Sequence, residues 1–223
     1  MRIVIIGDGL LGTEIFEQTK WDLRSRKKAN FSIYGDLSEL DEYSVIVNCI
    51  AHTNTYESNR ESHWDVNCVF LDRLIDYCNQ KSKKLIHIST DYIYAGSVSN
   101  ASEDDVPIHI GTWYGYTKNI GDALVQLRSK DYLVCRMSHK PNPFPYDFAW
   151  DNINTNCDYV DVIAKMVIEL IKNKRTGVYN VGTDKKTIYQ LALKTKDDVF
   201  PVNRNKNAPS DITMDLRKIK SNI

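Results

Sequence analysis

The chain has 223 residues, and its 29 lysines and arginines balance 29 aspartates and glutamates. This length is enough for one large domain with its own core. The zero net charge gives no electrostatic reason to expect nucleic acid or an anionic membrane as a partner. The number of cysteines, five, is odd, and no Cys-x-x-Cys pair occurs, which favours free thiols in a reducing compartment.

The apolar run at 1–6 ends at a glycine, so no signal peptide is predicted. No segment approaches the roughly 20 apolar residues that span a bilayer. We therefore predict a soluble, cytoplasmic protein with no nucleic-acid or membrane partner.

Short β-branched runs alternate with longer helical patterns along the chain. In order, the sequence predicts a strand at 3–6, a helix at 10–20, strands at 31–34 and 44–50, a helix at 66–79, a strand at 85–88, a helix at 116–128, a strand at 132–135, a helix at 160–172 and a strand at 177–181. The 44–50 run is apolar almost throughout, which is typical of a strand buried on both faces. The alternation indicates an α/β fold with a Rossmann-type, doubly wound parallel sheet.

Two stretches interrupt this alternation. Residues 140–157 carry three prolines, several asparagines and large aromatic side chains without a period, and residues 201–210 are also non-periodic. We therefore predict an NAD(P)-binding domain built from 1–139 and 158–182. A small, shortened C-terminal substrate-binding part is predicted from 140–157 and 183–223.

Three glycines follow the first predicted strand. Gly7, Gly9 and Gly12 have the G-x-G-x-x-G spacing, in a strand–turn–helix context. The first glycine allows a tight turn, the second lets the backbone approach a pyrophosphate, and the third lets the helix pack closely on the strand. The helix N-terminus at Leu10 and Leu11 then faces the phosphates. The pattern predicts dinucleotide binding, and a tight turn without a ligand is the alternative.

The group that contacts the adenosine ribose is less well defined by the sequence. Asp36 stands 29 positions beyond Gly7 and can either accept from a ribose hydroxyl or cap a helix at 37–40. Both interpretations stay open, and with them the choice between NADH and NADPH. The basic cluster at 24–28 is interpreted as a solvated helix end, with a phosphate contact as the alternative.

Tyr114 and Lys118 are four residues apart at the start of the helix predicted at 116–128, and side chains at this spacing share one face of a helix. A phenol has a pKa of about 10 and needs help to act at neutral pH. A neighbouring ammonium favours the phenolate. The hydroxyls of Ser89 and Thr90, at the end of the strand predicted at 85–88, are placed to hold a substrate carbonyl. The Tyr-x-x-x-Lys spacing is common on helix surfaces. It indicates a catalytic site only together with the glycine turn and the hydroxyls of Ser89 and Thr90.

With these features the chain resembles the extended short-chain dehydrogenases/reductases, and most nearly their dTDP-4-dehydrorhamnose reductase branch. The resemblance rests on the segments "VNCIAHTNTYESNRESHWDVN", "HISTDYIYAG", "YGYTKNIGDALV" and "PSDITMDLRKIK", and it covers nearly the whole chain. It implies a reductase of a nucleotide-linked (dTDP or UDP) 4-keto-6-deoxy sugar, in rhamnose-type deoxysugar biosynthesis. It further implies NADPH or NADH as cofactor and leaves a homodimer as a possible assembly.

The resemblance also implies roles for individual residues. Thr90 would orient the carbonyl, Tyr114 would donate the proton, and Lys118 would tune Tyr114 and hold the nicotinamide ribose. The cofactor would run over Ala51, His52, Thr53, Asn67 and Ser89, and the sugar would meet Asp91, Tyr92 and His139.

The chain departs from the branch at several points. Its glycine pattern is one residue tighter, His139 stands where tryptophan is frequent, and residues 140–157 replace a longer insertion. The sugar pocket is therefore expected to be abbreviated or completed by a partner chain. Asp91 occupies the position of the cysteine found in epimerising relatives, which argues against a combined epimerase–reductase.

Two alternatives remain: a non-catalytic, cofactor-binding regulatory subunit, and a nucleotide-sugar epimerase or dehydratase. The histidines show no metal-ligand spacing, so no metal site is predicted; they stand at positions 52, 63, 87, 109 and 139.

Overall fold

The computed structural model describes residues 2–108 and 111–223, and these form a six-stranded sheet in the order β2-β1-β3-β4-β5-β9. All pairings within this sheet are parallel. Its strands are β1 (Ile3–Ile6), β2 (Asp22–Arg24), β3 (Val45–Asn48), β4 (Lys84–Ile88), β5 (Tyr132–Arg136) and β9 (Gly177–Asn180). The predicted α/β fold with a doubly wound parallel sheet is confirmed.

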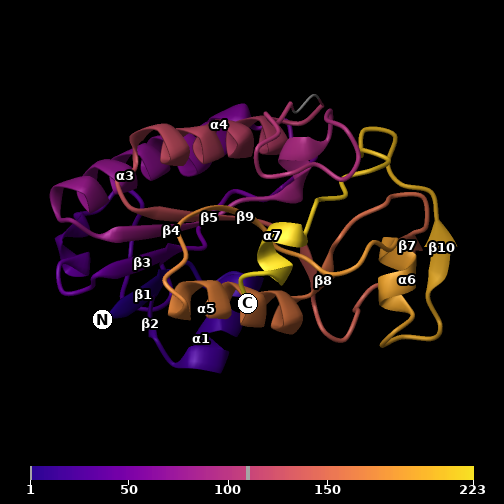
Figure 1. Cartoon of the computed structure of the whole chain (residues 1–223), viewed down its shortest axis with the longest axis horizontal. Coiled ribbons are helices and arrows are strands. Elements are labelled where there is room, and N and C mark those ends of the chain that lie inside the picture. The colour runs from indigo at the N-terminus through magenta and orange to yellow at the C-terminus, as the bar shows by residue number, and fades with distance from the viewer. Residues whose placement is uncertain (1, 109–110) are drawn as a thin grey trace.

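Helices cover both faces of the central sheet (Figure 1). On one face lie α1 (Leu10–Thr19) and α5 (Val160–Lys172), and on the other α3 (Phe70–Gln80) and α4 (Trp113–Arg128). Side chains of a strand alternate between faces, so Ile3 and Ile5 join the core beside α1 and α5, while their neighbours join the core beside α3. This two-sided burial explains the uninterrupted apolar runs of the strands.

The second strand is not where the sequence predicted it. It is β2, and residues 31–34 form a loop in which Phe31 is buried and packs edge-on against Phe70, with ring centroids 6.3 Å apart. The apolar character of that loop comes from a core anchor rather than from a strand. The basic cluster at 24–28 therefore follows a strand end, and its interpretation as a helix end is wrong, because α1 already ends at Thr19.

Two helices begin earlier than their apolar periodicity indicated. The helix predicted at 66–79 starts as α2 (Arg60–Trp64), passes through the π-helical turn η2 (Asp65–Val69) and continues as α3. Asn59 caps α2 by accepting from the backbone of Ser62, and Thr112 caps α4 by accepting from Gly115. These polar caps carry no apolar periodicity, although each is a recognised N-terminal residue type.

A smaller region lies beyond one end of the central sheet, where β7, β10 and α6 gather in Figure 1. It contains β7 (Phe148–Trp150), α6 (Ile188–Ala192) and β10 (Phe200–Val202). Strands β6 (His139–Lys140) and β8 (Asp158–Tyr159) lie where the chain passes between it and the central sheet, and α7 (Arg217–Lys220) packs against β9. Strand β7 pairs with β10, and β6 with β8. A third core cluster, which includes Phe144, Ile153, Leu191 and Ile212, fills this region. Two further short helical turns in the described part of the chain are the 3-10 helices η1 (Leu37–Leu40) and η3 (Asp91–Tyr94).

Among the helices of the described ranges, none is both long enough and apolar enough to cross a bilayer.

Candidate active site

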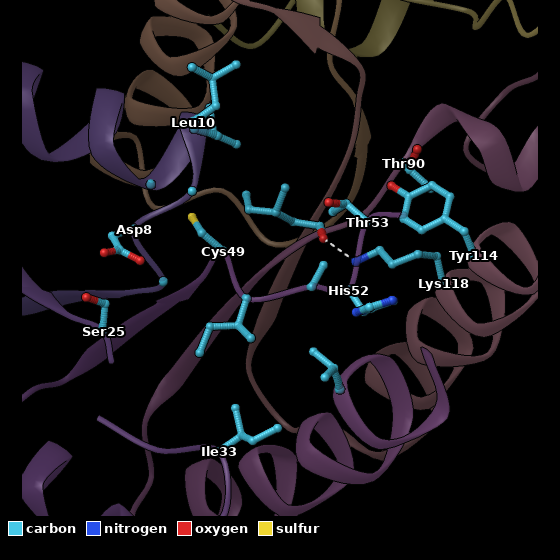
Figure 2. A pocket seen from close by; sticks show the side chains of 18 of the residues that line it. Asp8, Leu10, Ser25, Ile33, Cys49, His52, Thr53, Thr90, Tyr114 and Lys118 are labelled. Carbon is cyan, nitrogen blue, oxygen red and sulfur yellow. Dashed lines mark hydrogen bonds between the residues drawn. The ribbon is translucent and has the colours of Figure 1, made fainter. Parts of the chain in front are cut away.

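A cavity of 850 Å³ opens at the carboxyl ends of the central strands. Its walls come from the turn after β1, the loop after β3, the end of β4, and helix α4. Figure 2 shows Ser25 and Asp8 at one end of the cavity and Thr90 and Tyr114 at the other. In the sheet, β2 lies on one side of β1 and β3 lies on the other, so the strand order reverses direction between β1 and β3. Ligands of open α/β sheets bind at such a topological switch point.

The glycine turn has the geometry that its spacing predicted. Gly7 has φ +101°, and a Cβ there would meet Ile50 Cγ1 at 2.9 Å. At Gly12 a Cβ would lie 2.0 Å from the carbonyl oxygen of Gly7, so only glycine fits where α1 meets the turn. Gly9 has open space on its Cβ side within the described structure, and it lines the cavity with Leu10 and Leu11. The first N–H groups of α1 are thereby available to a phosphate.

Asp36 does not take part in this wall. Its carboxylate accepts from the backbone N–H of Ser38 at 3.0 Å and caps η1. The described residues that line the cavity near the end of β2 are instead Ser25 and Arg26. Of the two interpretations of Asp36, the structure supports the cap, and the contact with a ribose hydroxyl stays a prediction.

Thr90, Tyr114 and Lys118 converge at the other end of the cavity, as predicted. Thr90 ends the segment after β4 and caps η3, while the other two side chains extend from α4 (Figure 2). Nζ of Lys118 donates to the carbonyl oxygen of Ile88 at 2.7 Å, which fixes the ammonium at the carboxyl end of β4. A hydroxyl, a phenol and an ammonium therefore face one space from two elements.

Burial shifts the pKa of both titratable groups. It raises the pKa of Tyr114 to about 12, against a smaller lowering by the side-chain hydrogen bond with Thr90. It lowers the pKa of Lys118 to about 8, which Asp122 partly opposes. At neutral pH the phenol therefore holds its proton and the lysine keeps its charge. This is the protonation state of a proton donor beside a cation.

The loop after β3 lines the cavity with Ala51, His52 and Thr53. Asn67 holds this loop but is not among the described cavity-lining residues. Its Oδ1 accepts from the backbone N–H of His52 at 2.9 Å, and its Nδ2 donates to His52 O at 3.2 Å and to Thr117 at 3.0 Å. Asn67 thus makes a positioning contact from the π-helical turn η2, and its contact with the cofactor stays a prediction.

Ser89 lies at the cavity wall with a buried hydroxyl that has no hydrogen-bond partner within the described part of the chain. A buried hydroxyl without a partner is costly, so a ligand that bonds to it would be favoured. This unsatisfied group fits the predicted contact with a bound cofactor.

Of the three residues expected at the sugar, His139 is among the described cavity-lining residues, and Asp91 and Tyr92 are not. Burial lowers the pKa of His139 to about 4, so its imidazole is neutral at pH 7. Asp91 is fully buried behind Thr90 and accepts from Thr155 Oγ1 at 3.2 Å, so it does not reach the cavity. The Tyr92 hydroxyl lies 2.6 Å from that of Tyr56, and the Tyr92 ring packs edge-on against Tyr114 at 6.1 Å. The prediction that Asp91 faces the sugar is corrected, because burial and the Thr155 bond turn its carboxyl inward.

Sequence reasoning did not select several cavity residues. They include Asp8, Ser25, Arg26, Ile33, Cys49, Thr55, Ser62, Asp65, Met137 and Ser138. The basic cluster at 24–28, which contains Arg26, was the available signal. Its interpretation as a solvated helix end did not predict a contact with the cavity. The others come from loops whose side-chain direction only the fold defines.

The fold also brings together His52, Glu57 and His63, which the linear spacing did not connect. One ligand atom from each lies within 4.8 Å of the other two, and His52 Nε2 is 2.8 Å from Glu57 Oε2. His87 and His139 lie outside this group, and His109 lies outside the described residues.

Comparisons with known proteins agree with this fold. A reductase named as probable in low-salt glycan biosynthesis, from Haloferax volcanii, is 36% identical over 104 residues, which are 44% of this chain and 34% of that protein. A dTDP-4-keto-6-deoxy-D-glucose reductase from Streptomyces niveus is 25% identical over 171 residues, 68% of this chain and 59% of that protein. The matched region thus spans less than two thirds of each of these two relatives.

A solved structure of a dTDP-4-dehydrorhamnose reductase from Bacillus anthracis, in complex with NADP, superposes with a TM-score of 0.81. The match covers 99% of this chain and 91% of that one at 21% identity, so it bears on the fold. Residues 1–140 match the family described as RmlD substrate binding domain. Since this match covers more than half of the chain and agrees with the fold, the protein belongs to that family, among the extended short-chain dehydrogenases/reductases.

Proposed function

We propose that the protein is an NAD(P)H-dependent reductase of a nucleotide-linked 4-keto-6-deoxy sugar. The observation that carries the proposal is the convergence of Thr90, Tyr114 and Lys118 on the same cavity as the glycine turn. The names of the two curated relatives, both reductases, support the reaction type. Burial of Asp91 speaks against an epimerase in which this position acts on the sugar carbon.

The residues of the cavity fit a nicotinamide dinucleotide. The N-terminus of α1 and the open side of Gly9 suit a pyrophosphate, and the unpartnered Ser89 hydroxyl offers a bond further along the cavity. Lys118 would hold the nicotinamide ribose. When bound, the coenzyme supplies the hydride that reduces the sugar carbonyl.

The chain itself supplies orientation and a proton. The Thr90 hydroxyl would hold the carbonyl oxygen, and Tyr114, protonated at neutral pH, would give that oxygen its proton as the alcohol forms. The charged Lys118 would then stabilise the phenolate that remains. Solvent later returns the proton to Tyr114.

We propose NADPH as the preferred coenzyme. An acidic side chain at the end of the second strand recognises the ribose 2′-hydroxyl of NADH, whereas an arginine there accommodates the 2′-phosphate of NADPH. In this chain Ser25 and Arg26 line that end of the cavity, and Asp36 is engaged in the η1 cap.

The sugar is proposed to bind between Tyr92, His139 and the smaller region made of 140–157 and 183–223. This division of the chain into a coenzyme-binding domain and a substrate-binding part is a proposal, and the separate core of the smaller region supports it. The Tyr56–Tyr92 pair and the neutral His139 offer hydrogen bonds suited to sugar hydroxyls.

We further propose a homodimer in the cytoplasm. Trp64, Trp113 and Tyr116 are 47%, 41% and 48% exposed, on α2 and α4, and aromatic groups exposed together favour an interface with a second copy. Five cysteines without a disulfide support a reducing compartment. Light scattering after size exclusion should give twice the chain mass, and Trp113→Ser should reduce it toward the monomer.

The reaction is tested by mixing the protein with dTDP- and UDP-linked 4-keto-6-deoxyhexoses and following the absorbance of NADPH and NADH. We expect oxidation of the coenzyme by at least one of these sugars. Tyr114→Phe should lower kcat by roughly 10²- to 10⁴-fold while coenzyme binding is kept.

Tyr116→Phe, two residues away on the same helix and directed elsewhere, is the matched control and should keep full activity. Coenzyme binding without turnover of any sugar would favour the regulatory-subunit alternative. Full activity of Tyr114→Phe would contradict the assigned proton donor.

A further inference from the structure

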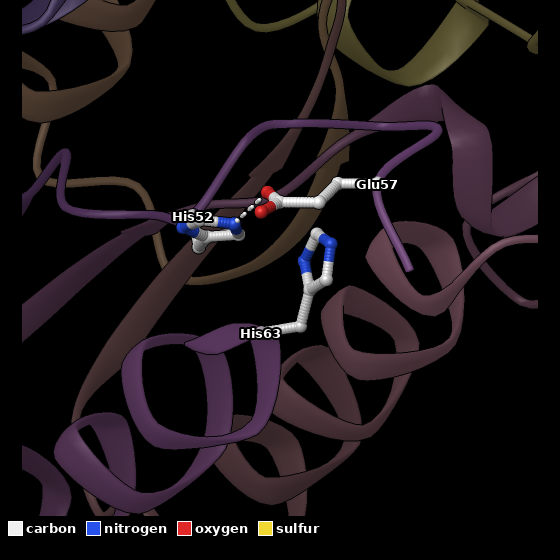
Figure 3. Close-up of side chains that lie close together, drawn as sticks. All are labelled: His52, Glu57 and His63. Carbon is white, nitrogen blue, oxygen red and sulfur yellow. Dashed lines mark hydrogen bonds and ion pairs between the residues drawn. The ribbon is translucent and has the colours of Figure 1, made fainter. Parts of the chain in front are cut away.

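A cluster of three side chains with metal-binding chemistry lies beside the cavity but is not needed for the proposed reaction. His52 and Glu57 come from the loop after β3, and His63 comes from helix α2 (Figure 3). Their ligand atoms lie within 4.8 Å of one another. Two imidazoles and one carboxylate are a ligand set that Zn²⁺ uses when a fourth position is open.

His63 is the member that ordinary packing explains least. Its side chain is fully buried, at 0% exposure, and neither ring nitrogen meets the distance and angle of a hydrogen bond with a described residue, although backbone groups of Asn54 and His52 lie near the ring. Its ring meets that of His52 edge-on, with centroids 4.4 Å apart. Unpaired buried polar groups are disfavoured, so a partner for this imidazole would relieve a cost that the fold now bears.

The other two members are already aligned. His52 Nε2 and Glu57 Oε2 are 2.8 Å apart, and 23% and 36% of their side chains are exposed, so an ion can enter from solvent. In a tetrahedral zinc site with Zn–N near 2.0 Å, neighbouring ligand atoms are about 3.3 Å apart. A small opening of the His52–Glu57 pair and a small approach of His63 would reach that spacing.

We propose that His52, Glu57 and His63 bind one divalent transition-metal ion of the Zn²⁺ type. The ion would join the loop after β3 to helix α2. Because His52 lines the cavity and the His63 ring lies 6.4 Å from that of Tyr114, the ion would fix the wall on the proton donor's side. Its fourth position would hold water. Imidazole ligands favour such an ion over Mg²⁺ or Ca²⁺, which prefer oxygen.

The test uses the tag-free full chain, stripped with a chelator and free of coenzyme and sugar. Co²⁺ is added while visible d–d absorption is followed, and Zn²⁺ is then used in competition and in calorimetry. We expect one equivalent to bind, with the intense visible bands of four-coordinate Co²⁺ that Zn²⁺ abolishes and excess Mg²⁺ leaves unchanged.

Glu57→Gln should weaken Zn²⁺ binding by at least tenfold, and His63→Gln by more. Glu61→Gln, an acidic residue of α2 outside the cluster, is the matched control and should bind as the original chain does. If His63→Gln does not fold, Glu57→Gln and Glu61→Gln still decide, because both lie at or near the surface.

No binding, or equal binding by Glu57→Gln and Glu61→Gln, would overturn the proposal. A thiolate-to-cobalt charge-transfer band in the near ultraviolet would do so too, because it would assign the ion to Cys49 in the cavity wall. The readout needs no turnover, so its failure is distinct from a failure of the proposed reductase activity.

Discussion

Asp91 shows how one buried carboxyl can connect the proposed site to the rest of the protein. It follows Thr90 directly, has no exposed surface, and accepts from Thr155 Oγ1, which belongs to the segment before β8. Burial raises its pKa to about 7, against hydrogen bonds from Thr155 and Thr90. The carboxyl therefore anchors Thr90 from behind, and its charge state matters for stability.

The buried Asp91 carboxyl should make stability depend on pH. Its pKa is raised in the folded state, so the unfolded chain loses the proton first as pH rises from about 3.8. The contribution of Asp91 to the free energy of unfolding should then decline up to about pH 7, by on the order of 4 kcal/mol, while the buried His139, with its lowered pKa, contributes a rise over part of the same range. Asp91→Asn cannot ionise and should lack this decline, so its stability relative to the original chain should increase between pH 4 and 8 in urea denaturation.

Asp184→Asn, at an exposed position, is the control for this experiment and should keep the decline. Parallel pH profiles for the original chain and Asp91→Asn would show that Asp91 is not the titrating group.

Arg26 should decide between the two coenzymes. A charge-assisted bond from its guanidinium to a 2′-phosphate is worth roughly 1.5–3 kcal/mol. Arg26→Ala should therefore lower kcat/KM for NADPH by roughly 10- to 100-fold, and that for NADH little. Lys27→Ala changes the next basic residue, which is not among the described cavity-lining residues, and should leave the ratio unchanged. An equal loss with both coenzymes would contradict this role.

Among the secondary-structure elements, the proposed catalytic helix is held by a buried ion pair. Arg136 of β5 donates from Nε and Nη2 to the two carboxylate oxygens of Asp122 of α4, at 3.0 and 2.8 Å, and both side chains are 1% exposed. Arg136 also donates to the hydroxyl of Tyr94 in η3, at 2.5 Å. Tyr94 in turn bonds to Asn180 of β9 at 3.0 Å. One network thus fixes α4 and η3, which carry or adjoin Tyr114, Lys118 and Thr90.

Breaking this ion pair should destabilise the fold strongly. Arg136→Met leaves the Asp122 carboxylate buried without its partner, a change that typically costs 3–5 kcal/mol. We expect a loss of about that size in the free energy of unfolding from urea denaturation. The double variant Arg136→Met/Asp122→Leu removes both charges and should regain much of the loss. A loss below about 1 kcal/mol for Arg136→Met would mean that the pair adds little.

Across the whole molecule, the larger and the smaller region are joined by buried polar contacts as well as by the chain. Thr155 lies in the smaller region, and its Oγ1 donates to the buried Asp91 carboxylate at 3.2 Å. Asn180 of β9 donates from Nδ2 to the carbonyl oxygen of Asp215 at 3.3 Å. Since the chain passes between the regions several times, we expect them to unfold together.

Coenzyme binding should therefore stabilise the whole chain. NADPH at 100 times its dissociation constant contributes about 2.7 kcal/mol. For a chain of this size that corresponds to a rise in Tm of roughly 5–10 °C. Differential scanning calorimetry should show one transition that moves as a unit. Two transitions, of which only one moves, would show that the regions unfold independently.

Local patterns in the sequence are sufficient to predict the fold class, the glycine turn and the Tyr114–Lys118 pair. These rest on local physics: strand and helix periods, the conformational freedom of glycine, and the four-residue spacing of a helix face. The same local rules predicted that Ser89 and Thr90 would stand at a strand end next to the ligand. Such features need only neighbouring residues, so they can be recognised in the linear chain.

Which polar side chains reach the cavity depends on the tertiary structure. Arg26 lines it and Asp36 does not, because the second strand is β2 and residues 31–34 are a loop anchored in the core by Phe31. Asp91 turns inward because it accepts a hydrogen bond from Thr155, a residue 64 positions away in the sequence. His52, Glu57 and His63 meet because a loop folds back onto α2. Each depends on contacts between residues or segments whose spacing no local period describes.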